Sequence, residues 1–344
     1  MAKNQHRVPA GVEPDEAARH FRAIDKLEER MMVAPAGLHR VGPAATAEAC
    51  AAAGLPPASA LLWMSFDGME IGAETARILP LAEIAEATER ADAEGLLRAG
   101  DRVIGEHGRD LLIVPEDPWE EGADVVRLEE GGERLPEATT VAHLALGWVG
   151  EAGVMFDDDG EFRDELFGED GELTAAAQRR LLRRRLDCDP DAPGPRLRLA
   201  QHLLRAGELR AAAKELKEVV HRAPDLPWAH ETMARVAEAR DDADGARRAY
   251  QRAAETVEAQ GDIAASAYFL ACAARSADED QRKALAERVQ SARPGFAREQ
   301  VEAAEILIER GALTEAGVVV DLGLSIAPVH VELLALRSRL SADA

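Results

Sequence analysis

The C-terminal half of this 344-residue chain repeats itself with a period near 34 residues. A glycine, a small residue, a bulky apolar residue and a proline recur at matching positions. They are Gly207, Ala212, Leu216 and Pro224 in one copy, and Gly311, Ala316, Val320 and Pro328 in another. A helix-turn-helix unit of this length cannot bury its apolar face alone, so it stacks on copies of itself. The repeat therefore predicts an all-α array from 193 to 344 with surfaces that bind other proteins.

Three stretches of this array, 193–226, 227–260 and 297–330, resemble the tetratricopeptide repeat. Ala212 stands where a small residue lets the second helix of a unit approach the first, and Pro224 stands at the exit turn. The packing positions of the first helix hold Leu199, Ala200, Leu203, Met233, Ala234, Ala237, Ala303, Ala304 and Leu307. The resemblance implies a helical superhelix. By pattern, 261–296 forms two further helices, and 330–341 forms a terminal capping helix.

The excess of negative charge lies in the middle of the chain. Residues 43–174 carry 8 basic and 31 acidic side chains, a net charge of −23, whereas 1–42 carry +1 and 175–344 carry −1. A field of this size disfavours nucleic acid and membrane surfaces and favours a basic protein partner. Solubility is the alternative explanation for the same excess.

The acidic segment has short apolar runs separated by glycines. Helices are predicted on both sides of a Leu-Pro-Pro break within 47–68, and again at 139–150. Strands are predicted at 76–81, 101–108, 109–116 and 123–130. Because no long crossover separates these strands, they favour an α+β domain with an antiparallel sheet.

From Thr46 to Gly153 the chain also resembles the SUKH superfamily, which includes the fungal Smi/Knr (SMI1/KNR4-like) regulators and many bacterial immunity proteins. The matching positions are Glu48, Gly54, Leu55, Pro56, Leu62, Phe66, Asp67, Gly68, Ile78, Pro80, Leu81, Ile104, Gly105, Gly108, Leu112, Val125, Val126 and Thr140 to Trp148. The resemblance implies an α+β fold and, as one function, toxin neutralisation.

Four segments follow from these patterns. They are a helical extension at 1–42, the acidic SUKH-like domain at 43–160, a linker at 161–192 and the repeats at 193–344. The extension holds an amphipathic helix, 13–32, that is expected to pack on the chain itself. The linker holds an Arg-rich helix, 178–187, for which an intramolecular contact or simple solvation is favoured over nucleic-acid binding.

Motifs that carry chemistry are absent from the sequence. Asp157 to Gly160 lacks the ligand spacing of a calcium loop, and His107 in a glycine turn has no nucleophile near it in sequence, so we expect it to be solvated. The three cysteines are far apart and form no metal-binding pattern. We expect no catalytic residue, cofactor or metal, and a cytoplasmic protein without a membrane span.

These observations predict a non-catalytic protein-binding protein. One hypothesis is an immunity protein whose acidic domain caps a basic toxin, and the alternative is a scaffold or adaptor. A Pro-bounded loop after a predicted strand holds the candidate partner-binding residues, in which a tryptophan is ringed by carboxylates. They are Glu116, Asp117, Trp119, Glu120 and Glu121.

Overall fold

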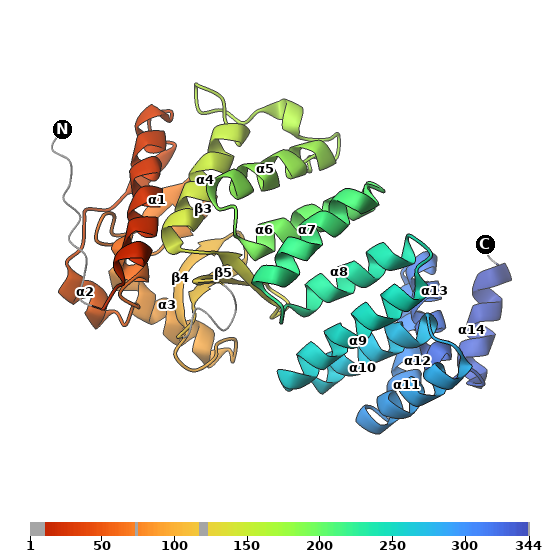
Figure 1. The fold of residues 1–344 in the computed structure, drawn as a ribbon. Coiled ribbons are helices and arrows are strands. Elements are labelled where there is room, and N and C mark those ends of the chain that lie inside the picture. The colour runs from red at the N-terminus through yellow and green to blue at the C-terminus, as the bar shows by residue number, and fades with distance from the viewer. Residues whose placement is uncertain (1–10, 73–74, 117–122, 343–344) are drawn as a thin grey trace. The chain divides into compact units, whose positions relative to one another are not determined.

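The computed structural model describes residues 11–72, 75–116 and 123–342 (Figure 1). Contacts divide the chain into two compact units. The first is Met1–His202 with His221–Ala223, and the second is Leu203–Val220 with Pro224–Ala344. This division falls within a helix of the first predicted repeat. The bounds of the four segments named above stay a prediction.

The first unit contains a seven-stranded antiparallel sheet in which strand order follows chain order. The strands are β1 (His39–Val41), β2 (Met69–Ile71), β3 (Ala76–Ile78), β4 (Arg102–His107), β5 (Asp110–Val114), β6 (Val125–Leu128) and β7 (Arg134–Ala138). The four predicted strands are confirmed as β3 to β6, as is the antiparallel α+β class. The sequence did not reveal β1 and β2, which have only three residues each, or β7, which contains Pro136.

A glycine lets two neighbouring strands of this sheet approach closely. A Cβ atom on Gly105 in β4 would lie 2.5 Å from the carbonyl oxygen of Arg77 in β3. The pairing of β4 with β5 also shifts between Val103 and Gly105. Glycine inside a strand commonly marks such a bulge and close backbone approach.

A single apolar helix forms the core beside the sheet. The helices of this unit are α1 (Pro14–Val33), α2 (Ala47–Ala52), η1 (Ser59–Leu61), α3 (Leu81–Ala93), α4 (Val141–Met155), η3 (Asp164–Leu166) and α5 (Ala175–Cys188). Helix α4 contacts β2 and β7, and α1 and α5 cover it on other sides. Eleven of its 15 residues are therefore buried. The prediction that α1 packs on the chain is confirmed by its fully buried Ile24 and Leu27.

The predicted helix after the Leu-Pro-Pro break was wrong in extent. Only the short 3₁₀ helix η1 forms there, and the chain continues as turns to Gly68. Gly68 has φ +85°, and a Cβ atom on it would lie 2.9 Å from the nitrogen of Pro80. The Asp67 carboxylate accepts a 2.7 Å hydrogen bond from the backbone N–H of Leu81 at the start of α3. These contacts give the Asp-Gly and Pro-Leu pairs of the SUKH-like pattern a structural role.

The C-terminal part of the chain is a series of helices, as predicted. They are α6 (Pro193–Arg205), α7 (Leu209–Arg222), α8 (Pro227–Glu238), α9 (Ala243–Ala259), α10 (Ile263–Arg275), α11 (Glu279–Ala292), α12 (Phe296–Glu309), α13 (Leu313–Ile326) and α14 (Val331–Ala342). The small residues Ala212, Ala246 and Ala316, which recur in the repeat, have no exposed surface.

Helix α10 is the centre of the second unit. It packs on α9, α11 and α13, and eight of its residues are buried. The hydroxyl of Ser325 in α13 donates a 3.1 Å hydrogen bond to the carbonyl oxygen of Ala271 in α10. Thus the second helix of the last pair, α13, supplies the main contact to the preceding pair. The face of α10 that stays exposed is narrow.

Candidate protein-interaction site

The predicted acidic loop is described in part. Glu116 is exposed, and its side chain lies over Gly100, where a Cβ atom would come within 2.5 Å of the Cβ of Glu116. Asp117, Trp119, Glu120 and Glu121 lie outside the described residues. The loop therefore stays a predicted partner site.

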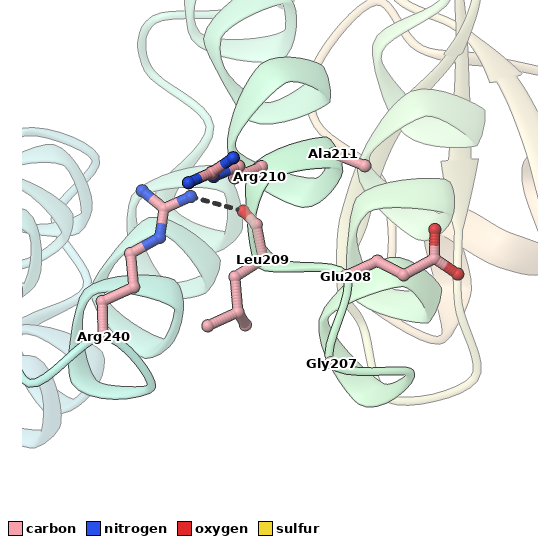
Figure 2. A pocket seen from close by; sticks show the side chains of 6 residues that line it. All are labelled: Gly207, Glu208, Leu209, Arg210, Ala211 and Arg240. Atoms are coloured by element: carbon pink, nitrogen blue, oxygen red, sulfur yellow. Dashed lines mark hydrogen bonds between the residues drawn. The ribbon is translucent and has the colours of Figure 1, made fainter.

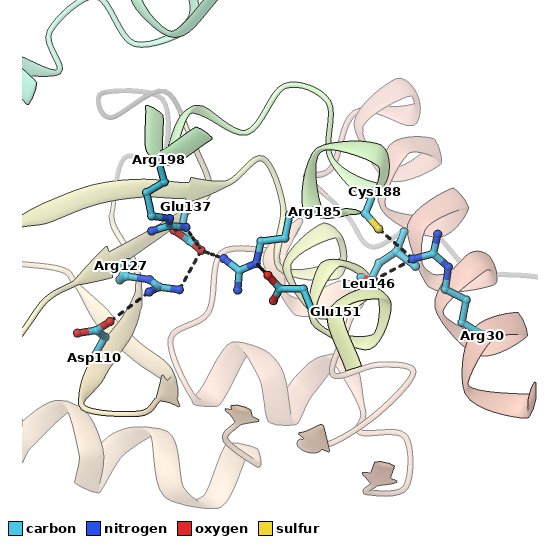
Figure 3. A network of polar contacts seen from close by, with 9 residues as sticks. All are labelled: Arg30, Asp110, Arg127, Glu137, Leu146, Glu151, Arg185, Cys188 and Arg198. Atoms are coloured by element: carbon cyan, nitrogen blue, oxygen red, sulfur yellow. Dashed lines mark hydrogen bonds and ion pairs between the residues drawn. The ribbon is translucent and has the colours of Figure 1, made fainter. Parts of the chain in front are cut away.

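A fully buried carboxylate organises the polar core of the first unit (Figure 3). Glu137 in β7 is surrounded by arginines from three other elements. Arg127 of β6 donates to it over 3.1 Å, and Arg198 of α6 donates over 2.8 Å to each carboxylate oxygen. Arg185 of α5 completes the set with a further hydrogen bond. The carboxylate thus ties β6, α5 and α6 to one strand of the sheet.

The charges in this network are balanced by further carboxylates. Arg185 forms a 2.7 Å ion pair with Glu151 of α4, and Arg127 forms one of 3.2 Å with Asp110 of β5. Burial alone would raise the pKa of Glu137, but the surrounding arginines outweigh burial and hold this pKa well below its usual value. Glu137 therefore stays ionised, and the network has a structural role.

The network also places the Arg-rich helix. Arg185 makes the intramolecular contact that the sequence favoured for 178–187, and Leu181 and Leu182 are buried beside it. Arg179, Arg180, Arg183 and Arg184 instead line a cleft between α4 and α5. Sequence reasoning missed Glu137 and Arg185, because residues 48 positions apart give no local signal of pairing.

The expectation of a solvated His107 was wrong. The imidazole stacks on the indole of Trp148 in α4, with ring centroids 5.6 Å apart and planes 15° apart. Burial, followed by the charges of Arg127 and Arg185, lowers the pKa of His107 to about 3. A neutral, stacked imidazole at the end of β4 contributes to packing.

The second unit has a surface on α8 and α10 where aromatic and charged side chains gather. Positions three to four residues apart share one side of a helix. The rings of Trp228 and Tyr268 both contact Phe269 edge-on, at centroid distances of 5.7 and 5.4 Å. Glu231 pairs with Arg235 over 3.7 Å. We call this surface the α8/α10 face, and it comprises Trp228, Glu231, Arg235, Tyr268, Cys272 and Arg275.

Most side chains of the α8/α10 face are exposed or partly exposed, which suits binding to another protein rather than core packing. Tyr268 is 43% exposed. Arg235 and Arg275 are also exposed, and Trp228 is partly exposed. Tyr268 and Arg275 are exposed on α10, although eight residues of this helix are buried. Trp, Tyr and Arg are the residues most enriched among those that dominate binding energy at protein interfaces.

Burial raises the pKa values of three groups on this face, which are Cys272, Tyr268 and Glu231. Burial raises the pKa of the Cys272 thiol to about 12, which leaves no thiolate at neutral pH. Burial is also the main cause that raises the pKa of Tyr268 and that of Glu231. Nε2 of His230, the residue before Glu231, forms a 2.7 Å hydrogen bond with the carbonyl oxygen of Pro224. The thiol of Cys272 is therefore not activated as a nucleophile.

A hollow of about 760 Å³ lies between the α6–α7 turn and the end of α8 (Figure 2). One of its two arginines, Arg240, donates a 2.7 Å hydrogen bond to the carbonyl oxygen of Leu209. The Glu208 carboxylate points away from Arg240 (Figure 2). These side chains join two turns and form no convergent set for chemistry.

In residues 11–72, 75–116 and 123–342, no group of three or more His, Cys, Asp or Glu side chains is arranged to hold a metal ion. Within the same part of the chain, every helix is too short or too polar to cross a membrane.

Comparison with known proteins gives likeness at the level of folds alone. No protein family matches the sequence, and no curated protein matches it. Similar solved structures include the crystal structure of yeast Tom70, with 17% identity over 49% of this chain and 36% of that chain and a TM-score of 0.33. Another is the APC/C hetero-tetramer Cut9–Hcn1, with 15% identity over 58% of this chain and 42% of that chain and a TM-score of 0.27. The chain spans less than half the length of either, and such low scores carry no argument about function.

Proposed function

We propose that this chain is a protein-interaction scaffold whose second unit binds a partner through the α8/α10 face. The observation that carries the proposal is that the α8/α10 face holds two aromatic rings, Trp228 and Tyr268, together with the exposed Arg235 and Arg275. Both rings rest on the buried Phe269, so their positions are fixed before a partner arrives. Pre-organised side chains lose less conformational entropy on binding.

The helices below this face provide a rigid support. The core of this unit includes Phe269, Leu270 and Tyr250, and the Tyr250 hydroxyl donates a 3.1 Å hydrogen bond to Glu238 of α8. A surface held by a packed core changes little on binding. The face therefore suits recognition of a folded or helical protein segment that offers apolar side chains and a carboxylate for the arginines.

Comparative affinity purification tests the proposal. The natural chain and the double variant Trp228→Ala/Tyr268→Ala are each used as bait, with Leu313→Ala as the matched control because Leu313 is also an exposed apolar residue of this unit. We expect a specific partner to be depleted about tenfold with the double variant and retained with the control. Equal recovery of every partner with all three baits would contradict the proposal.

A second candidate function is neutralisation of a basic toxin by a SUKH-like first unit, as in the bacterial immunity proteins of that superfamily. The observation that favours it is the net charge of −23 in residues 43–174. We propose that the partner contacts one loop, which contains Glu116, Asp117, Trp119, Glu120 and Glu121. A cytoplasmic site of action belongs to this proposal.

Association kinetics test the second candidate. Charge reversal at the four acidic loop positions should slow association with a basic partner more than it speeds release, and added salt should slow it for the natural chain. Stopped-flow mixing at low and high salt measures both rates. An association rate that is independent of salt and of the four reversals would rule out electrostatic capture and would leave the scaffold proposal untouched.

A further inference from the structure

We propose that the cleft between α4 and α5 in the first unit is a binding site for a small, compact polyanion that carries phosphoryl groups. The cleft has a volume of about 620 Å³, within the range of small-molecule sites. Its α5 wall carries four arginines in two successive turns, and its α4 wall is formed by glycines and a valine. The cleft shares no residue with the α8/α10 face or with the acidic loop that begins at Glu116.

Three of the four arginines of the cleft are available for a ligand, and Arg179 has a contact within the chain. Arg180 and Arg183 are exposed and Arg184 is partly exposed. Within the part of the chain that the structure describes, these three guanidinium groups form no ion pair or hydrogen bond with another side chain. Arg185, the next residue, is by contrast fully engaged with Glu137 and Glu151. One helix therefore turns one arginine inward to the core and leaves three facing solvent.

Helix geometry arranges these charges in two rows. Residues four apart on a helix lie about 6 Å apart along its axis, so Arg180 and Arg184 form one row, and Arg179 and Arg183 form the other. The planar guanidinium group offers paired N–H donors that match the oxygens of phosphate. One phosphoryl group of a ligand can thus meet Arg180 and Arg184, which lie on successive turns, and a second phosphoryl group can meet Arg183.

One glycine of α4 gives the ligand room and another is covered by the chain. A Cβ atom on Gly150 would lie 2.8 Å from a guanidinium nitrogen of Arg30, 3.1 Å from Sγ of Cys188 and 3.3 Å from Nε of Arg184, so this glycine lets these side chains lie against α4. A Cβ atom on Gly153 would meet no other atom within 4 Å, which means that the space above Gly153 is open. Helix α4 therefore leaves open space at Gly153, next to Val154 in the wall of the cleft.

Carboxylates at both ends limit the size of the ligand. Asp187 closes one end of the cleft. At the other end, the 157–172 segment packs through Leu166 and Phe167 on Val154, and that segment carries nine acidic side chains and one arginine. From Ala176 to Asp187 the cleft is about 16 Å long along α5. An extended polyanion such as a nucleic acid would run onto these carboxylates, whereas a compact ligand would not.

Isothermal titration calorimetry with inorganic tripolyphosphate tests the site in the full chain. We expect one equivalent to bind at low salt. Arg180→Gln/Arg183→Gln should weaken binding about tenfold or more, because it removes two charge-assisted contacts. Gly153→Leu should weaken it as well, since the new side chain fills open space without altering charge and favours the helix. Arg310→Gln/Arg337→Gln removes the same charge at two exposed positions of the second unit and should leave the affinity within about twofold.

The outcomes separate the ligand classes. Binding of tripolyphosphate that both cleft variants weaken and the control does not would support the proposal. Absence of binding to the natural chain, or binding that neither cleft variant changes, would overturn it. A synthetic peptide of alternating Asp and Gly is titrated in parallel. If the peptide binds in the cleft and tripolyphosphate does not, the site recognises acidic protein segments and the phosphoryl assignment is wrong.

Discussion

Glu137 binds three arginines from three elements, so its replacement leaves the buried Arg127 and Arg185 and the partly buried Arg198 without their shared partner. We expect Glu137→Gln to lower the free energy of unfolding of the first unit by about 3–5 kcal/mol, as the loss of one partner of a buried ion pair does. Glu130→Gln is the matched control, because the Glu130–Arg109 pair is exposed on both sides and should contribute less than about 1 kcal/mol. Urea denaturation followed by tryptophan fluorescence measures both, and equal costs would contradict this account.

Asp124 gives the first unit a pH dependence. Its Oδ2 lies 3.8 Å from Nε2 of His20, whose pKa burial lowers to about 4, so the imidazole is neutral and offers no charge. Burial raises the pKa of Asp124 from 3.8 to about 7. A raised pKa of an acid means that its stabilising effect is complete below pH 3.8 and is lost as pH rises to 7.

The isosteric change Asp124→Asn tests this sign, because the amide is neutral at every pH. The variant should be more stable than the natural chain above pH 7. Its advantage should shrink by about 1.4 kcal/mol per pH unit between pH 7 and pH 4, since only the natural chain gains stability there. Urea denaturation at pH 8, 6 and 4.5 gives the difference directly. A difference that stays constant with pH would show that Asp124 is ionised in the fold.

At the scale of elements, the repeat places its small residues in the core. Ala316 of α13 has no exposed surface, whereas Val318 on the same helix is 52% exposed. We expect Ala316→Trp to lower the free energy of unfolding of the second unit by about 1–3 kcal/mol through overpacking. Val318→Trp should change it by less than about 0.5 kcal/mol. Equal melting of the two variants would show that the assigned repeat register is wrong.

Elements with a strong period could be predicted from the sequence, and elements held by distant contacts could not. The apolar period revealed α1 and the repeat helices, and glycine-bounded apolar runs revealed β3 to β6. Strands β1 and β2 owe their place to pairing with each other and with β3, and three residues carry no period. The α8/α10 face was missed because Trp228 and Tyr268 lie on different helices, and an apolar pattern does not tell a core aromatic from an exposed one.

At the scale of the whole molecule, each of the two units carries at least one proposed binding surface. The first unit carries the acidic excess and the arginine cleft, and the second carries the α8/α10 face on a packed helical support. The central claim is that the α8/α10 face contacts a partner protein. Loss of a partner from a purification is an indirect sign of contact, whereas a covalent bond formed at one position is direct evidence.

Site-specific photo-crosslinking in the native cell is therefore the most direct test. A photoreactive phenylalanine analogue replaces Tyr268 in one experiment and Val318, an equally exposed residue of the same unit, in another. We predict a discrete adduct of the chain with one protein from position 268, lost when Trp228→Ala is also present, and no such adduct from position 318. The same adducts from both positions, or none from position 268, would contradict it.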